Sequence, residues 1–171
     1  MQKNLIFLAL ICITPTLYAE SSWLPEAKLN MNEAKKWNVG AGFTQKLLHV
    51  NGEMPNPYGI SYVKLGAYLN DGNSPGGQIG FRYPYYLTGT QLNGYYIGAY
   101  AGTVQSLKVD GDRKARFGGG IDLAYVWLSK ERISTLSVGL GAGQTIKNAA
   151  GDVVEEVDPR LQFSYTLSFG L

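Results

Sequence analysis

The C-terminal stretch RLQFSYTLSFGL, residues 160–171, alternates without a break between apolar and polar residues. One set of alternate positions carries Leu161, Phe163, Tyr165, Leu167, Phe169 and Leu171. The other set carries Gln162, Ser164, Thr166, Ser168 and Gly170. A period of two is the pattern of a β-strand with one apolar face. This stretch therefore predicts a strand, and similar segments precede it in the chain.

Six further segments show the same alternation, and turn residues separate them. The segments are residues 37–47, 60–70, 77–87, 95–107, 115–128 and 133–146. The stretch from Asn51-Gly52 through Pro57 is one of several with the glycine, proline, asparagine and aspartate content of loops. No helical segment lies between the strands, and no GxGxxG or P-loop pattern precedes a helix, which excludes an α/β nucleotide-binding fold. The sequence predicts an all-β, antiparallel, up-and-down protein.

The polar face of these segments decides between two kinds of β protein. A soluble β-sandwich places charged residues on its solvent face, but here that face is mostly Gly, Ser and Thr. Charged residues make up 16% of the chain, against about 25% in an ordinary soluble domain. A transmembrane barrel has the opposite arrangement, with apolar residues toward lipid and small polar residues inside. Aromatic residues also gather at segment ends, as in the girdles of such barrels. We therefore predict a transmembrane β-barrel, with a soluble periplasmic β-sandwich as the alternative.

This pattern resembles the small bacterial outer-membrane β-barrels, which are eight-stranded single chains with both termini in the periplasm. The resemblance covers about residues 37–171. It implies that the outer-membrane assembly machinery reads the last strand, through Phe163, Tyr165, Leu167, Phe169 and Leu171. Members usually close on Phe, where this chain has Leu171. The resemblance further implies contact with outer-membrane lipid and lipopolysaccharide, and location in the cell outer membrane.

An eighth strand is needed, because single-chain bacterial barrels have even strand numbers. Residues 27–32 alternate and are one candidate, and residues around 149–157 are the other. The N-terminal candidate also fits an amphipathic helix with Pro25 in its first turn. We favour the helix for the N-terminal segment, residues 20–36, and place the eighth strand at 149–157.

Residues 1–19 have the layout of a secretory signal peptide, with Lys3, an apolar run and a small residue at Ala19. The apolar run is too short for a transmembrane anchor. The one cysteine, Cys12, lies inside this segment without the small residue before it that a lipoprotein requires. We expect cleavage after Ala19 and a mature barrel over 37–171 without disulfides.

Five charged residues fall on the predicted inner face. They are Lys46, Lys64, Arg82, Arg116 and Asp122. Buried charges need partners. The first interpretation is a structural plug, completed by tyrosines. The second is a basic lumen that binds or passes small anions, for which inner-face glycines would leave room.

His49 is the single histidine, and the lone candidate for a base at neutral pH. The lipid A-modifying enzymes of the barrel class imply a rim histidine with a serine or acid, and Ser61 and Glu53 are the nearby candidates. Nothing in the spacing singles them out, so we predict no catalytic residue and lean against an enzyme. Asp110-Gly111-Asp112 lacks the later ligands of a calcium loop and reads as a hairpin turn. We expect no cofactor and no metal.

The near balance of 15 basic and 13 acidic residues argues against a nucleic-acid partner. The sequence thus predicts a barrel with a structural or surface-interaction role, with residues 51–58 among its exposed loops. A small anion-selective or ligand-holding barrel and a lipid-modifying enzyme are the alternatives.

Overall fold

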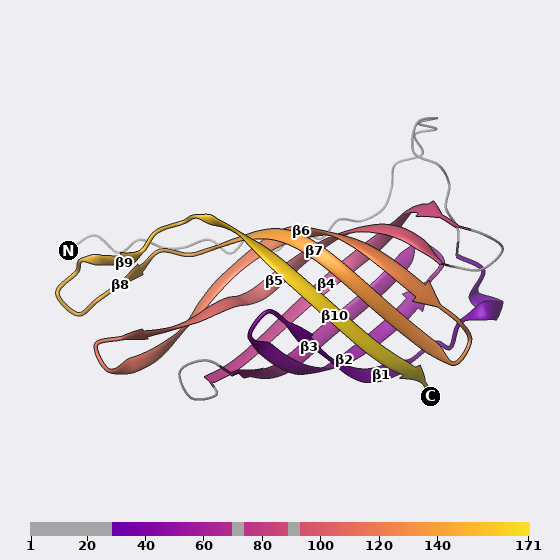
Figure 1. Ribbon diagram of the computed structural model, residues 1–171, viewed down its shortest axis with the longest axis horizontal. Helices are drawn as coiled ribbons and strands as arrows, with labels where there is room; N and C mark the ends of the chain where they lie inside the picture. The colour runs from indigo at the N-terminus through magenta and orange to yellow at the C-terminus, as the bar shows by residue number, and fades with distance from the viewer. Residues whose placement is uncertain (1–28, 70–73, 89–92) are drawn as a thin grey trace, which may run out of the picture.

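The computed structural model describes residues 29–69, 74–88 and 93–171, and its main element is a closed β-barrel of eight strands (Figure 1). Around the ring the strands follow the order β1, β10, β7, β6, β5, β4, β3, β2, each antiparallel to its neighbours. The barrel strands are β1 (Asn38–Thr44), β2 (Leu47–Asn56), β3 (Gly59–Tyr68), β4 (Ser74–Leu87), β5 (Gly94–Val109), β6 (Asp112–Leu128), β7 (Arg132–Gly143) and β10 (Pro159–Gly170). A single closed ring excludes the two-sheet sandwich.

The two ends of the barrel differ. At one end, here called the hairpin end, β5 and β6 extend into a long hairpin beside a small sheet of β8 (Ile146–Lys147) and β9 (Val153–Glu155) (Figure 1). At the other, the C-terminal end, β10 finishes and the 3-10 helix η1 (Met31–Glu33) lies close by (Figure 1). Among the described residues, no helix is long and apolar enough to cross a membrane.

The predicted sidedness of the strands is confirmed. Large apolar side chains at alternate positions point outward and are exposed, among them Val39, Phe43, Leu65, Ile79, Ile121, Leu140 and Phe163. Polar and charged side chains on the other face are buried inside the ring, among them Asn38, Lys64, Gln78, Arg82, Asp122, Ser164 and Thr166. The outer surface is thus apolar, whereas the interior is polar over most of its length.

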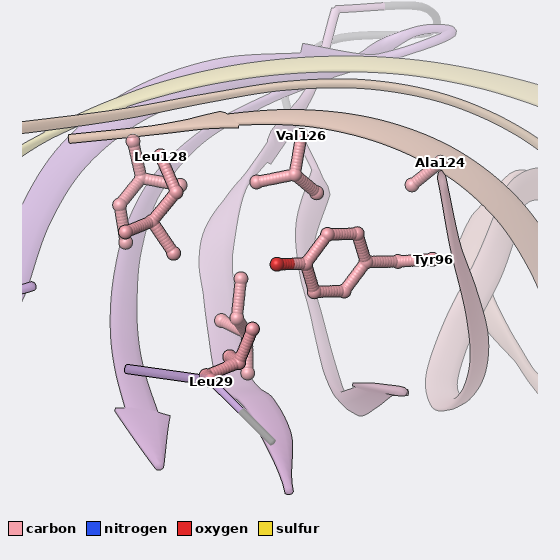
Figure 2. Close-up of a cluster of buried hydrophobic side chains, with 7 residues drawn as sticks. Leu29, Tyr96, Ala124, Val126 and Leu128 are labelled. Atoms are coloured by element: carbon pink, nitrogen blue, oxygen red, sulfur yellow. The ribbon is translucent and has the colours of Figure 1, made fainter. Parts of the chain in front are cut away.

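The C-terminal end of the interior is the exception, because apolar side chains close it (Figure 2). Inward residues of β3, β5, β6 and β7 form the cluster there: Ile60, Tyr96, Ala124, Val126, Leu128 and Ile133. Leu29 packs against them, with Met31 and Ala34 partly buried alongside. The segment that we predicted as an amphipathic helix is therefore, from residue 29 onward, a short 3-10 turn that covers one mouth of the barrel.

The eighth strand is the main correction. Neither predicted segment supplies it: residues 29 and 30 lead into η1, which contains 31 and 32, and 149–157 contains only the short β9, which pairs with β8 outside the ring. Residues 27 and 28, like the predicted signal peptide, lie outside the described residues. The missing strand is β2, which includes Asn51-Gly52, predicted as loop. Asn51 points inward and donates a hydrogen bond to Ser168 Oγ (2.7 Å). Its side chain is therefore part of the barrel interior and does not stabilise a turn.

Two further details follow from this correction. The predicted strand 37–47 ends early, because Gln45, with a left-handed φ of 48°, turns the chain from β1 into β2. Residues 51–58, predicted as an exposed contact loop, instead form barrel wall up to Asn56 and then the β2–β3 turn at the C-terminal end.

Inner-face glycines make room for neighbouring side chains. A Cβ on Gly98 would lie 2.0 Å from Asp122 Oδ1, and a Cβ on Gly141 would lie 2.2 Å from the Tyr100 hydroxyl. The side chains of Asp122 and Tyr100 thus occupy the space that these glycines provide. The anion-binding interpretation had expected that space to be open.

We predict that Gly120→Val destabilises the barrel by about 1–3 kcal/mol, the usual cost of overpacking. Its Cβ would lie 2.1 Å from the Leu140 carbonyl oxygen and 2.6 Å from the Tyr100 hydroxyl. Gly52→Val is the matched control, because its Cβ meets only Val63, at 3.4 Å. The urea midpoint of the refolded protein measures the effect. Equal midpoints for the two variants would contradict the filled interior.

Candidate functional site

A buried ion pair joins β4 and β6, the two strands that flank β5 in the barrel wall. Arg82 on β4 donates to Asp122 Oδ2 on β6 from Nη2 (2.7 Å) and from Nε (3.1 Å). Both side chains are nearly inaccessible, at 1% and 6%. The guanidinium also lies 4.4 Å from the ring centre of Tyr62, a favourable cation–π position. The pair and the tyrosine together fill the middle of the interior.

Lys64 lies in the next layer toward the hairpin end. Its Nζ donates to Ser164 Oγ (2.9 Å) and Thr44 Oγ1 (3.2 Å). Thr44 Oγ1 also lies 3.2 Å from His49 Nε2. The Lys64 ammonium group is therefore held by hydrogen bonds to hydroxyls, and the buried carboxylates of Asp122 and Glu53 attract its charge.

His49 is buried at 3% exposure and points into the interior from β2, so it is not the rim residue that the sequence suggested. Its hydrogen bond goes to Thr44, whereas Glu53 accepts a hydrogen bond from Ser168. Ser61 follows Ile60 on β3 and faces away from the buried Tyr62. The structure does not bring these three residues together as a catalytic set.

Glu53 is the interior charge that sequence reasoning assigned to the wrong place. It is buried at 2% exposure, with Ser168 and Asn51 around it. Lys46, by contrast, lies exposed in the β1–β2 turn. The interior thus holds Lys64, Arg82 and Arg116 against Glu53 and Asp122. The interior therefore carries an excess of one basic residue over acidic ones, which is smaller than the excess that the sequence indicated.

Arg116 lies at the hairpin end and is fully buried. It donates to the carbonyl oxygens of Gln144 (2.9 Å) and Gly143 (3.1 Å), and pairs with Glu155 (3.5 Å) and Asp158 (3.3 Å). Arg160 pairs with the same two carboxylates. These contacts hold the β7–β10 connection against β6 at the hairpin end.

Two cavities lie inside the barrel, a very small one at its centre and a larger one at the hairpin end. One of about 10 Å³ lies beside Lys64, Tyr100 and Asp122. The other, of about 120 Å³, opens at the hairpin end between Lys46, Tyr68, Arg116 and Arg160. A water molecule needs about 10–15 Å³ of such volume, so the central cavity has room for roughly one. The interior arrangement suits a solid plug better than a channel or a substrate pocket.

Within the described ranges, no group of three or more His, Cys, Asp and Glu side chains is placed to hold a metal ion. Comparison with protein-family models, with curated proteins and with solved structures finds no match. The proposals below therefore rest on the geometry of this chain.

We predict strong coupling between Arg82 and Asp122. Arg82→Met leaves a buried carboxylate unpaired and should cost about 3–5 kcal/mol, as should Asp122→Asn, which leaves the guanidinium unpaired. The double variant removes both charges and should recover at least half of that loss. Urea unfolding of all four proteins measures the cycle. Additive losses would mean that the pair does not act as a unit.

The hairpin-end ion pairs should weaken in acid. Desolvation raises the pKa of Asp158, but the Arg116 hydrogen bond and the charges of Arg160 and Arg116 together outweigh this effect and hold the pKa below its usual value. A carboxyl with a lowered folded-state pKa stabilises the fold above its unfolded pKa, and the contribution disappears as pH falls through the folded value. We expect segment 144–158 to exchange amide hydrogens faster at about pH 3 than at pH 7, after correction for intrinsic rates. In Asp158→Asn the pH effect should shrink. An unchanged effect in that variant would assign it to other groups.

Proposed function

We propose that this chain is an outer-membrane β-barrel with a structural or surface-interaction role, in which the barrel serves as the anchor and the hairpin end carries the contacts. The observation that carries the proposal is a closed ring whose outer face is apolar and whose interior is packed with polar side chains. The closed ring pairs its strands all round, as backbone in a bilayer requires.

The outer face supports a lipid environment. Large apolar side chains are exposed on every barrel strand, from Val39 and Val50 through Leu65, Ile79, Ile97, Ile121 and Leu136 to Phe163. A soluble protein rarely exposes a continuous apolar surface of this kind. Toward the C-terminal end, aromatic residues gather: Trp37, Tyr85, Tyr86, Tyr95 and Trp127 are exposed, and Tyr125 packs at 5.0 Å from Tyr95 and 4.7 Å from Trp127 between ring centres. Aromatic belts of this kind favour the membrane–water interface.

The filled interior favours an anchor over a pore. Arg82, Asp122 and Tyr62 occupy its centre, and the apolar cluster around Leu29 and Tyr96 closes the C-terminal end. An eight-stranded barrel has an interior just wide enough for side chains to fill. For the same reason we do not favour the anion-selective pore.

The hairpin end supports the interaction role. The β5–β6 hairpin and the β8–β9 sheet extend beyond the barrel wall there (Figure 1). With the termini in the periplasm, as in the barrels that this sequence resembles, this end faces the cell exterior. The signal peptide over 1–19 and the C-terminal strand would bring the chain to the assembly machinery and into a membrane of lipid and lipopolysaccharide.

Fractionation combined with gel mobility tests the proposal. We expect the protein in the outer-membrane fraction, with a mobility in unheated SDS that changes on boiling, because a closed barrel exposes no strand edge from which to unfold. In planar bilayers it should pass no steady current. Replacing residues 148–152 by a glycine–serine linker should leave the gel shift intact, because the segment lies outside the ring. Recovery as a soluble periplasmic protein without a gel shift would overturn the proposal, and a steady current would overturn the closed interior.

A further inference from the structure

The larger interior cavity, of about 120 Å³, opens at the hairpin end and is closed toward the middle of the barrel. It is here called the mouth pocket, and its lining includes Lys46, Tyr68, Arg116 and Arg160. Thr44, Gln78 and Gln162 line both this pocket and the small central cavity, so they lie between the two. Gln78 Nε2 donates to Gln162 Oε1 (3.4 Å), and both side chains are buried. The mouth pocket is therefore a blind pocket with a polar floor, not the entrance of a channel.

The β1–β2 turn forms part of the pocket wall, and hydrogen bonds hold its backbone on both sides. Gln45 N donates to the Phe163 carbonyl oxygen (2.9 Å). The Lys46 carbonyl oxygen accepts from Leu69 N (2.7 Å). The backbone around Lys46 is thus fixed without a ligand, which lowers the entropy cost of binding one.

Three residues of the lining have hydrogen-bond donors that find no acceptor among the described residues. The donors are Lys46 Nζ, Gln105 Nε2 and Arg160 Nη1. Gln105 Oε1 accepts from Arg116 Nη1 (3.3 Å), which leaves the nitrogen of the same amide available. A ligand rich in acceptors can satisfy these donors, and a carboxylate carries acceptors only.

The charges around the mouth pocket match a ligand with one negative charge. The described residues that line it include three cations, Lys46, Arg116 and Arg160, and no acid. The two arginines are paired with Glu155 and Asp158, which are not among the lining residues. Three cations against two carboxylates leave one positive charge, and Lys46 is the cation without an ion pair among the described residues. A carboxylate balances that charge, whereas a phosphate group, at about −1.5 to −2, exceeds it.

We propose that the mouth pocket binds the carboxylate group of a small organic acid, with Lys46 Nζ at the carboxylate and the Gln105 amide beside it. The pocket has about ten times the volume that one water molecule needs, which suits a carboxylate on a short substituent. Deeper in the barrel, Lys64 and Arg82 are matched by Glu53 and Asp122, so the interior below the floor adds no net charge. The inference deepens the proposed function, because it names the chemistry that the hairpin end recognises. It rests on that function only for the side of the membrane from which the ligand comes.

A nuclear magnetic resonance titration tests the site in the isotope-labelled mature chain, refolded in micelles of a zwitterionic detergent. Acetate is the probe, and it replaces chloride at constant ionic strength, so a shift reports a preference for carboxylate over chloride. Acetamide is the neutral counterpart of the same shape. The signals are the backbone amides of residues 44–46 and the side-chain amide of Gln105. The heat-dependent gel shift verifies the folding of every variant.

We expect acetate to shift these signals to saturation and acetamide to leave them in place. Lys46→Gln should weaken acetate binding about ten-fold or more, because it removes a charge-assisted hydrogen bond. Lys147→Gln is the matched control and should leave binding unchanged, since Lys147 is an exposed lysine of the hairpin end outside the pocket. Gln105→Glu keeps an acceptor for Arg116 but adds a negative charge to the pocket, so it should abolish binding.

Two further probes distinguish the kinds of anion. Inorganic phosphate should bind more weakly than acetate, and tighter binding of phosphate would overturn the charge match. Glucuronate presents the same carboxylate on a sugar ring. It should also bind more weakly, because the pocket is small, and tighter binding of glucuronate would overturn a small acid in favour of a saccharide.

The contrary outcomes separate this site from the proposed function. Absence of acetate shifts in a chain that shows the gel shift would overturn the carboxylate site and leave the membrane barrel standing. Equal weakening by Lys46→Gln and Lys147→Gln would assign the effect to the general charge of the hairpin end, and would also overturn the site. Recovery from cells as a soluble periplasmic protein would overturn the proposed function, while saturating acetate shifts would still support the site.

Discussion

The pairing of the first strand with the last is the constraint on which the rest of the structure depends. β1 and β10 align from Asn38 with Gly170 to Thr44 with Ser164, and this ladder turns a meander of seven hairpin-type connections into a ring. Once the ring is closed, alternation along each strand assigns every side chain to the inside or the outside. A slip of one residue at this seam would turn Asn38 and Thr44 of β1 outward, or Phe163 and Phe169 of β10 inward, so the register is strongly specified.

Closure also creates a narrow interior that must be filled without leaving charges unpaired. Large side chains on one strand lie over glycines on neighbouring strands. Tyr100 occupies the space over Gly120 and Gly141, and Asp122 occupies the space beside Gly98. Because breaking a buried pair leaves a desolvated charge, the Arg82–Asp122 contact makes the centre of the barrel intolerant of single changes. The two ends of the barrel differ from this centre: an apolar cap closes one mouth, and the Arg116 contacts hold the loop at the other.

The sequence was informative about sidedness and less so about count and register. Alternation is a local property, so the strands and their apolar faces could be predicted one at a time. β2 was missed because Asn51-Gly52 has turn chemistry locally, while pairing with β1 and β3 extends that stretch. Missing β2 also placed Glu53 outside and residues 51–58 in a loop. The sequence left open whether tyrosines fill the space beside the inner glycines or whether that space is empty, because the tyrosines come from neighbouring strands whose register no single segment contains. The end of the β4–β5 ladder at Gln78 and Gly102 likewise could not be predicted, because it depends on the register of two strands.

Collision accessibility of spin labels along β7 tests the central claim, a polar-filled barrel in lipid, most directly. Single cysteines are placed at consecutive positions from Ile133 to Ala142 in the mature chain, which has no other cysteine after the predicted cleavage. A polar-filled barrel in lipid predicts that the oxygen collision rate of the labels alternates along β7 with a period of two. Labels replacing the outward Leu136, Val138 and Leu140 should collide with oxygen and not with a water-soluble nickel chelate, and labels at the inward Thr135 and Ser137 should collide with neither. Strong nickel collisions at the outward positions would place that face in water and contradict the account.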